Sequence, residues 1–560
     1  MSSVAAHNPR QRTRLRLLLS FFLLALCTEG APPPRLILTV LQDDWGYATA
    51  SFNRPPASPP LPEQRTPRLD ALAASGIILQ RHYAHSFCSP TRSSFLSGRL
   101  PVHVQSANVQ PDEPNAGVPA AMTTLPEKLA QLGFVGHVGG KWDVGMATRA
   151  HTPEGRAFNS SLIFFAHAVD AFDQRDVDGL CGQRFVDLWD TGAPARALNG
   201  TDYFDELVVQ RLVRVIATHD FAAAPLYVHY TPHVTHNPLQ APAAYLNALN
   251  YTVDDESVCQ ASVDTSPTGA VYPGGPAGNS TPCRRALEAM AAFADDAMGR
   301  IVDAIVAAGV WDETLISWQS DNGGSIDLRY GGGLNLPLRG GKATWWEGGM
   351  RVAALVSGGY VPVAARGSRV AGTTHTADFY ATLCALAGGT PAFCAADARA
   401  AAAGAPPIDS LNLWPLLTGA SGSSPRAGFA ASPTALVSGP WKLLLGDVGG
   451  ASWTGTLWPN ASSPERDVSA FTAHCGSKGC LFDVEGDPSE HADVAGAHPD
   501  VVARLKAELA AATRTFWANN ESGVCAHNAS LSIHSACACD AASAVWGGFL
   551  GPYAGEPSGR

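Results

Sequence analysis

The stretch LILTVLQDD, residues 36–44, joins a largely apolar run to a pair of carboxylates. Its first six residues read as a buried strand. A second stretch of the same design, TLISWQSDN, follows at residues 314–322. Ligand sites in a parallel α/β sheet lie outside the carboxyl ends of the strands, so we expect both polar pairs at one crevice. The residues concerned are Asp43, Asp44, Asp321 and Asn322.

Strand and helix patterns alternate along most of the chain. Apolar runs typical of strands recur at 225–230 and 352–356, and helical patterns cover 204–218 and 284–308. This alternation predicts an α/β fold, in which helices cover both faces of a large mixed, mostly parallel sheet.

We expect three parts along the chain. Residues 1–30 read as a signal peptide, residues 31–425 as the main α/β domain, and residues 426–560 as a smaller α+β C-terminal subdomain. Within the last part, 434–445 reads as two short strands and 498–517 as a long helix.

The N-terminus indicates export. Four arginines between residues 10 and 16 precede an apolar run at 17–27, which is too short to span a bilayer comfortably. A short membrane anchor is the alternative, and no other segment is apolar enough to span. We therefore expect the secretory pathway, with the protein in the extracellular space or in a lysosome- or vacuole-like compartment. Sequons of the form Asn-x-Ser/Thr agree with this, at Asn159, Asn199, Asn250, Asn279, Asn460, Asn520 and Asn528.

The overall charge limits the class of partner. The chain has 560 residues, of which 46% are hydrophobic and 16% charged, and its formal net charge is −11. An acidic balance argues against nucleic acid and anionic membrane as partners, although a single pocket can still be basic.

The cysteines also fit an oxidising compartment. There are twelve, of which Cys27 leaves with the signal and Cys88 stands apart in the frame CSPTR. Ten remain, an even number that allows five disulfides. Close spacing suggests the pairs Cys259/Cys283, Cys384/Cys394 and Cys475/Cys480, and leaves Cys181, Cys525, Cys537 and Cys539 unassigned.

The polar residues at the two strand ends are candidate metal ligands. Three carboxylates and one amide offer only hard oxygen donors, which suit calcium or magnesium rather than zinc or copper. A single Asp at a strand end is usually a cap or turn residue. Two pairs in equivalent places favour a metal site.

Several basic residues fall in loop-like stretches that belong near a ligand. Lys141 lies in GGKWDVG and Lys342 in PLRGGKATWWEGG, and both stretches are rich in glycine. Arg92 comes one helical turn after Cys88, and His236 follows the strand at 225–230. A metal surrounded by cations binds anions, and a tetrahedral oxyanion is the natural occupant. The alternative to ligand binding is a solvated surface charge for each lysine. For the histidine, the alternative is a structural hydrogen bond.

Cys88 does not fit an ordinary use of cysteine. The stretch SFCSPTRSSFLSGRLP, residues 86–101, places it at the start of a helix, where backbone N–H groups and the helix dipole favour an anion. A catalytic thiolate would suit that position. It would not explain the hard oxygen ligands, which do not match a soft sulfur.

Taken together, these stretches resemble the sulfatases of the alkaline-phosphatase-like fold. CSPTRSSFLSGR is similar to the family signature, in which the cysteine is oxidised to formylglycine during secretion. DDWGYAT, GGKWDVG, THNPLQAP, SDNGG and LRGGKATWWEGGMR are similar to the other family blocks and occur in the same order. PLRGGKATWWEGG and HNPLQAP look closest to the arylsulfatase B, or N-acetylgalactosamine-4-sulfatase, branch.

The resemblance implies a role for each residue and a formylglycine-generating enzyme as a partner during secretion. Arg92 would hold the hydrated formylglycine, a geminal diol. Lys141 and Lys342 would bind the sulfate oxygens, and His236 would protonate the leaving group. One diol hydroxyl attacks sulfur, and the other then loses a proton and expels sulfate. One calcium ion would bind residue 88 together with Asp43, Asp44, Asp321 and Asn322.

One position departs from the family pattern. The family usually has GKWHLG, with a histidine that contacts the diol, whereas this chain has Asp143 in that slot. A carboxylate can act as the base in the elimination step, or it can slow the site by adding negative charge. His137 is the alternative source of an imidazole.

The implied activity is hydrolysis of the sulfate ester of an aryl compound or a saccharide. A phosphomonoester or phosphodiester hydrolase of the same fold is the alternative enzyme, and an inactive relative that binds sulfated glycans is the alternative without catalysis. Trp345 and Trp346 lie beside Lys342, where they could stack on a sugar ring or pack under the loop.

Overall fold

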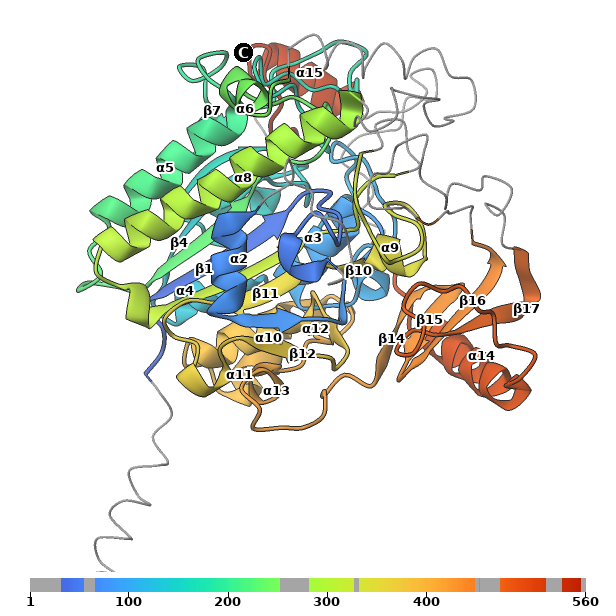
Figure 1. Cartoon of the computed structure of the whole chain (residues 1–560). Helices are drawn as coiled ribbons and strands as arrows, with labels where there is room; N and C mark the ends of the chain where they lie inside the picture. The colour runs from blue at the N-terminus through green and yellow to red at the C-terminus, as the bar shows by residue number, and fades with distance from the viewer. Residues whose placement is uncertain are drawn as a thin grey trace, which may run out of the picture.

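The computed structural model describes residues 32–54, 66–251, 282–326, 332–448, 453, 474–519 and 536–554. A large sheet with helices on both faces forms the main body, and a small antiparallel sheet with one long helix lies beside it (Figure 1). Within these residues, no helix is both long and apolar enough to cross a membrane.

The main sheet has ten strands in the order β12-β2-β11-β9-β1-β8-β4-β5-β6-β7. Its centre is parallel, because β1 pairs with β8 and β9, and β4 pairs with β8 and β5, in the parallel sense. β11 runs antiparallel to β9. The mixed, mostly parallel sheet expected from the sequence is confirmed. The central strands are β1 (Leu36–Gln42), β4 (Val135–Lys141), β5 (Ser160–Phe164), β8 (Leu226–Thr231) and β9 (Thr314–Ser320).

Short strands complete this part of the molecule. A three-stranded sheet of order β10-β3-β13 adjoins the large one. The outer strands of the large sheet are β2 (Ile77–Leu79), β6 (Trp189–Asp190), β7 (Ala193–Pro194), β11 (Ala354–Ser357) and β12 (Ser368–Val370). The three-stranded sheet consists of β3 (His82–Tyr83), β10 (Arg351–Val352) and β13 (Thr374–His375).

Strand β1 is buried on both faces, which explains its nearly continuous apolar run. Leu36 and Leu38 belong to a core cluster with residues of α2, α5 and α8. Ile37 and Leu41 belong to a second cluster with residues of α3, α4 and α10. The helices that build these layers are α2 (Pro67–Ala74), α3 (Cys88–Ser97), α4 (Leu125–Gln131), α5 (Phe204–Thr218), α8 (Pro282–Ala307) and α10 (Asp378–Leu386).

Helices α5 and α8 lie side by side over one face of the sheet (Figure 1). Shorter helices fill the edges and loops. They are α6 (Ala243–Ala248), α9 (Glu347–Met350), α11 (Pro391–Ala395), α12 (Ala398–Ala402) and α13 (Trp414–Leu417).

The smaller sheet contains more strands than the sequence suggested. Its order is β14-β15-β16-β17, and all neighbours are antiparallel. Only β15 and β16 correspond to the two strands expected at 434–445. Helix α14 packs on this sheet through Val502, Leu505 and Leu509. The bounds are β14 (Gly428–Ser432), β15 (Ala435–Ser438), β16 (Trp441–Asp447), β17 (His474–Asp483) and α14 (Pro499–Thr513). The division of the chain after residue 425 stays a prediction.

The last described helix, α15 (Ala536–Ala544), packs on the main body. Ala538 and Ala542 belong to the same core cluster as Ile37, and a disulfide joins Cys539 to Cys181. Two local disulfides expected from the sequence, Cys384–Cys394 and Cys475–Cys480, are confirmed. The expected Cys259–Cys283 pair and Cys525 fall partly or wholly outside the described residues.

Candidate active site

The register of β1 and β9 brings the two polar pairs together. Gln42 is the register partner of Ser320, so the residues that follow each strand emerge side by side at one edge of the sheet. The backbone N–H of Asp44 donates to Oδ1 of Asp321 at 3.1 Å, and Nδ2 of Asn322 donates to Oδ1 of Asp44 at 2.7 Å. The two polar pairs therefore meet at one edge of the sheet, as expected from the sequence.

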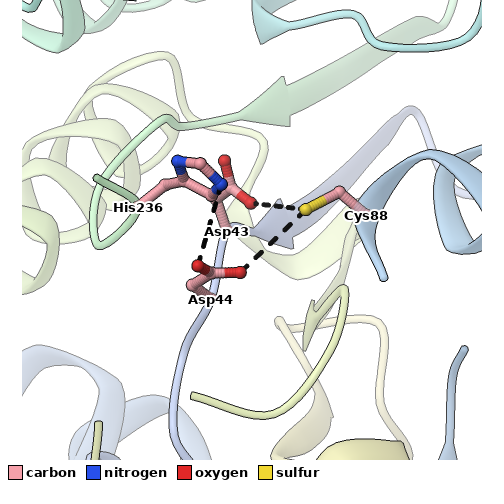
Figure 2. A group of neighbouring side chains, drawn as sticks. All are labelled: Asp43, Asp44, Cys88 and His236. Carbon is pink, nitrogen blue, oxygen red and sulfur yellow. Dashed lines mark hydrogen bonds and ion pairs between the residues drawn. The ribbon is translucent and has the colours of Figure 1, made fainter. Parts of the chain in front are cut away.

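Cys88 is the first residue of α3 and lies against the carboxylates. Its Sγ lies 3.4 Å from Oδ1 of Asp43 and 4.0 Å from Oδ1 of Asp44. Figure 2 shows the thiol facing both carboxylates. Burial and the charge of Asp321 raise the pKa of the Cys88 thiol well above its ordinary value, although two nearby lysines oppose the shift. An unmodified cysteine at this position would be a neutral thiol rather than a reactive thiolate.

The carboxylates at the strand ends all pair with buried cations, and Asp43 also lies 3.4 Å from Arg92. Nζ of Lys141 lies 3.0 Å from Asp43, and Nζ of Lys342 lies 2.8 Å from Asp44. Nη2 of Arg92 donates to Oδ2 of Asp321 at 2.7 Å. Burial alone would lower the pKa of all three cations, but the paired carboxylates hold each pKa above its ordinary value. The cations therefore stay charged, each of them against a carboxylate.

The oxygen atoms at the strand ends fit a hard divalent cation. Oδ1 of Asn322 is buried and has no hydrogen-bond partner among the described residues, so it is left to bind something else. Ligand atoms of Asp43, Asp44, Cys88 and His236 all lie within 4.8 Å of one another. Burial and the charge of Asp43 raise the pKa of Asp321 to about 6, and a bound cation would relieve this repulsion.

His236 faces the same crevice from the loop after β8 (Figure 2). Its Nδ1 lies 2.6 Å from the carbonyl oxygen of Asn237, so Nδ1 carries the proton, and Nε2 points toward Asp44 at 3.8 Å. Burial, followed by Lys342 and Lys141, lowers the pKa of His236 well below its ordinary value. The imidazole is therefore neutral beside the two lysines.

Asp143 is the residue at which the sequence leaves the family pattern. It has a φ of 49°, an uncommon backbone conformation for a residue other than glycine. Its Oδ2 lies 3.7 Å from Nζ of Lys141, and its Oδ1 accepts a hydrogen bond from Nδ1 of His167 at 2.9 Å. Burial alone would raise the pKa of Asp143, but His167 and Lys141 hold it below its ordinary value.

The sequence argument missed His167, which follows β5 by three residues. Nothing about its motif pointed to function. The signal available was its position, because β5 lies parallel to β4 and ends at the same edge of the sheet. A polar residue shortly after β5 is therefore expected near the residues that follow β4.

His137, the other expected source of an imidazole, is not at the crevice. It lies four residues before Lys141 on β4, roughly 13 Å along the strand, and its Nδ1 is hydrogen-bonded to Ser160 at 2.6 Å. The suggestion that His137 replaces the family histidine is therefore wrong.

The two tryptophans after Lys342 have different environments. Trp346 is completely buried, with the Arg339 guanidinium 3.7 Å from its ring centroid and Phe482 at 5.5 Å. It packs under the loop rather than facing a substrate. Trp345 is half-buried and meets His85 edge-on at 5.0 Å.

Comparisons with known proteins agree with this site. The sulfatase family model matches residues 35–389. Arylsulfatase J of Mus musculus is 29% identical over 512 residues, covering 87% of this chain and 77% of that protein. Arylsulfatase A of Homo sapiens is 28% identical over 515 residues, covering 85% of this chain and 87% of that protein.

Solved structures agree on the fold. The crystal structure of Ps i-CgsB in complex with k-i-k-neocarrahexaose has a TM-score of 0.64 at 21% sequence identity, and covers 87% of this chain and 94% of that one. The architecture expected from the sequence, an alkaline-phosphatase-like α/β fold, is confirmed. The matched family model spans β1, α3 and β9, which carry the metal-ligand candidates and Cys88. The chain therefore belongs to the sulfatase family and is a sulfuric ester hydrolase.

Proposed function

We propose that Cys88 is converted to formylglycine, and that its hydrated form is the nucleophile of sulfate ester hydrolysis. The observation that carries this proposal is a buried thiol packed between carboxylates that favour hard ligands. Of the cysteines whose side chains the structure describes, Cys88 is the one outside a disulfide. A formylglycine diol replaces the mismatched sulfur with oxygen and offers one hydroxyl for attack and one for elimination.

Calcium is the metal that best fits the site. Asp43, Asp44, Asp321 and the free Oδ1 of Asn322 would hold it together with the oxygen atoms of modified residue 88. When bound, calcium would supply positive charge that polarises the sulfate ester and the oxygens of residue 88.

The buried cations would hold the sulfate group. Lys141 and Lys342 each carry hydrogen-bond donors that now face Asp43 and Asp44. They would turn to the sulfate oxygens once a divalent metal neutralises those carboxylates. Arg92 would keep residue 88 in place while it stays paired with Asp321. Charge that develops on the sulfate oxygens then meets fixed donors in a site that excludes water.

Two residues would move protons. His236 would donate to the departing alcohol oxygen from Nε2, which faces Asp44 and must first take up a proton because the neutral ring carries its proton on Nδ1. The negative charge of bound sulfate would oppose the two lysines that now lower the pKa of His236. Asp143 would accept the proton from residue 88 when sulfate leaves, with His167 holding its carboxylate in place.

The substrate class that we infer is a sulfated saccharide or an aryl sulfate. The Ps i-CgsB structure holds a neocarrahexaose, and half-buried Trp345 offers an aromatic surface close to Lys342. The arylsulfatase B branch, a secreted or lysosome-like location and conversion by a formylglycine-generating enzyme are parts of the same proposal. They rest on the sequence blocks, the leader and the sequons.

The proposal is tested by comparing an aryl sulfate with the matching aryl phosphate. The purified protein, made in a host that converts sulfatase cysteines, should release sulfate much faster than phosphate. A Cys88→Ala variant should keep the fold and lose turnover. Faster phosphate release would favour the phosphoester alternative, and glycan binding without release of either ion would favour an inactive relative.

A further inference from the structure

A buried ionic triad joins the smaller sheet to the loop that carries Lys342. Nζ of Lys442, on β16, lies 3.2 Å from Oε1 of Glu347 and 2.8 Å from Oε1 of Glu490. All three side chains are fully buried, with 0% exposure. Removing one partner from a buried ion pair is costly, so Lys442 resists separation from either glutamate.

Glu347 is the point where the triad meets the main body. It opens α9 only five residues after Lys342. Its Oε2 accepts a hydrogen bond from the Tyr83 hydroxyl at 3.0 Å and lies 3.5 Å from Arg351, and its backbone N–H donates to Glu490 at 2.7 Å. Both the backbone and the side chain at the start of α9 are therefore held in place.

The segment between Arg339 and Glu347 also makes contacts outside the triad, through Trp346 and Ala343. The ring of Trp346 lies between the Arg339 guanidinium and Phe482 of β17, at centroid distances of 3.7 Å and 5.5 Å. The backbone N–H of Ala343 donates to the carbonyl of Ser86 at 2.8 Å, two residues before Cys88. The segment is thus placed between the nucleophile's own loop and the smaller sheet.

The residues on the far side of these contacts lie outside the matched family region, which ends at residue 389. Lys442, Phe482 and Glu490 all come later in the chain. The loop that carries Lys342 is therefore contacted by residues that the matched region does not itself contain.

We propose that the smaller sheet positions the sulfate-binding Lys342 through the Glu347–Lys442–Glu490 triad, which makes Lys442 and Glu490 positioning residues for substrate binding. The proposal rests on the proposed role of Lys342 in binding sulfate. Lys342 reaches Asp44 at 2.8 Å, so a displacement of about 1 Å in this loop moves its ammonium out of hydrogen-bond range of a bound sulfate.

The test uses a Lys442→Met/Glu490→Gln double variant of the full chain. It leaves Glu347 with Tyr83 and Arg351 as partners, so no unpaired charge is buried and the protein should fold. Hydrogen exchange should be faster in peptides from 339–350. KM for an aryl sulfate and Ki for inorganic sulfate should both rise about ten-fold.

Arg426→Met is the matched control. It also breaks a buried ion pair, with Asp378, but its hydrogen bonds go to Asp378 and Asp409 rather than to the Lys342 loop. It should lower Tm without changing KM, Ki or exchange in 339–350.

If the triad only stabilises the fold, the double variant should have a lower Tm but the same KM, Ki and exchange in 339–350 as the wild type, like the control. Unchanged KM, Ki and exchange in the double variant would therefore overturn the proposal, whatever its Tm. If the wild-type protein releases no sulfate, the proposed function fails, and the exchange comparison still decides whether the triad holds the loop.

Discussion

Asp143 places a carboxylate beside a site built to hold an anion. The structure shows how the extra charge is accommodated, because His167 and Lys141 contact its two oxygen atoms. These neighbours keep the pKa of Asp143 below its ordinary value in spite of burial. A carboxylate with a lowered pKa stays ionised as the pH falls, so it remains able to accept a proton in acidic conditions.

Replacing Asp143 tests its role as the elimination base. Asp143→Asn keeps the shape and removes the proton acceptor, so the variant should release one equivalent of alcohol and then stall. Mass spectrometry should find sulfate bound to residue 88. The exposed Asp303→Asn is the control and should turn over normally. Wild-type turnover by Asp143→Asn would assign Asp143 a structural role only.

Asp321 tests the metal assignment. Asp321→Ala removes a carboxylate oxygen from a calcium site that needs six to eight oxygen ligands, and it leaves Arg92 with Asp43 as its remaining carboxylate partner. Calcium content, measured by atomic emission, and activity should fall together. Full activity of wild-type protein after exhaustive removal of metal would contradict the assignment.

At the scale of elements, the disulfide that ties α15 to the main body should matter most for stability. Cys181 and Cys539 are 358 residues apart in sequence, whereas Cys475 and Cys480 are separated by 5. A cross-link that closes a longer loop restricts the unfolded chain more. Cys181→Ser/Cys539→Ser should lower the free energy of unfolding by about 2–5 kcal/mol, as measured by denaturant titration.

The matched Cys475→Ser/Cys480→Ser variant is the control for this prediction and should lose less. Equal losses in the two variants would show that chain entropy does not govern these cross-links.

Elements whose pattern follows from burial could be predicted from the sequence. Strand β1 reads as buried because both of its faces are covered, and the polar pairs after β1 and β9 meet because parallel strands end at one edge. His167 and the triad could not be predicted in this way. His167 carries no motif, and Lys442 contacts Glu347 only after two distant parts of the chain have folded together.

The smaller sheet could also be predicted only in part from the sequence. β14 and β17 were missed, and the 10-residue β17 contains Gly476 and Gly479, which weaken the apolar alternation typical of a strand. β17 becomes a strand through its pairing with β16, a contact that no local pattern reveals.

For the whole molecule, the triad also makes stability depend on pH. Burial, together with the charge of Glu347, raises the pKa of Glu490 from 4.5 to about 7, although Lys442 opposes the shift. Between these values the folded state holds a proton that the unfolded state releases, so Glu490 costs stability as the pH rises through this window. A glutamine does not ionise, so Glu490→Gln removes this pH-dependent loss of stability.

The Tm of Glu490→Gln relative to wild type should therefore increase between pH 5 and pH 7.5, by a few degrees in differential scanning calorimetry. The comparison cancels the contribution of the buried histidines, which both proteins share. A Tm difference that does not change with pH would show that Glu490 is ionised throughout.

The main body carries the proposed nucleophile and metal ligands, and the smaller sheet contacts the loop of Lys342 through Lys442. The central claim is that residue 88 is a formylglycine. Mass spectrometry of the tryptic peptide 82–92, from protein made in a host with the converting enzyme, tests it most directly. We expect an aldehyde at residue 88 that reacts with a hydrazide probe. A peptide that carries only unmodified or disulfide-bonded cysteine would contradict it.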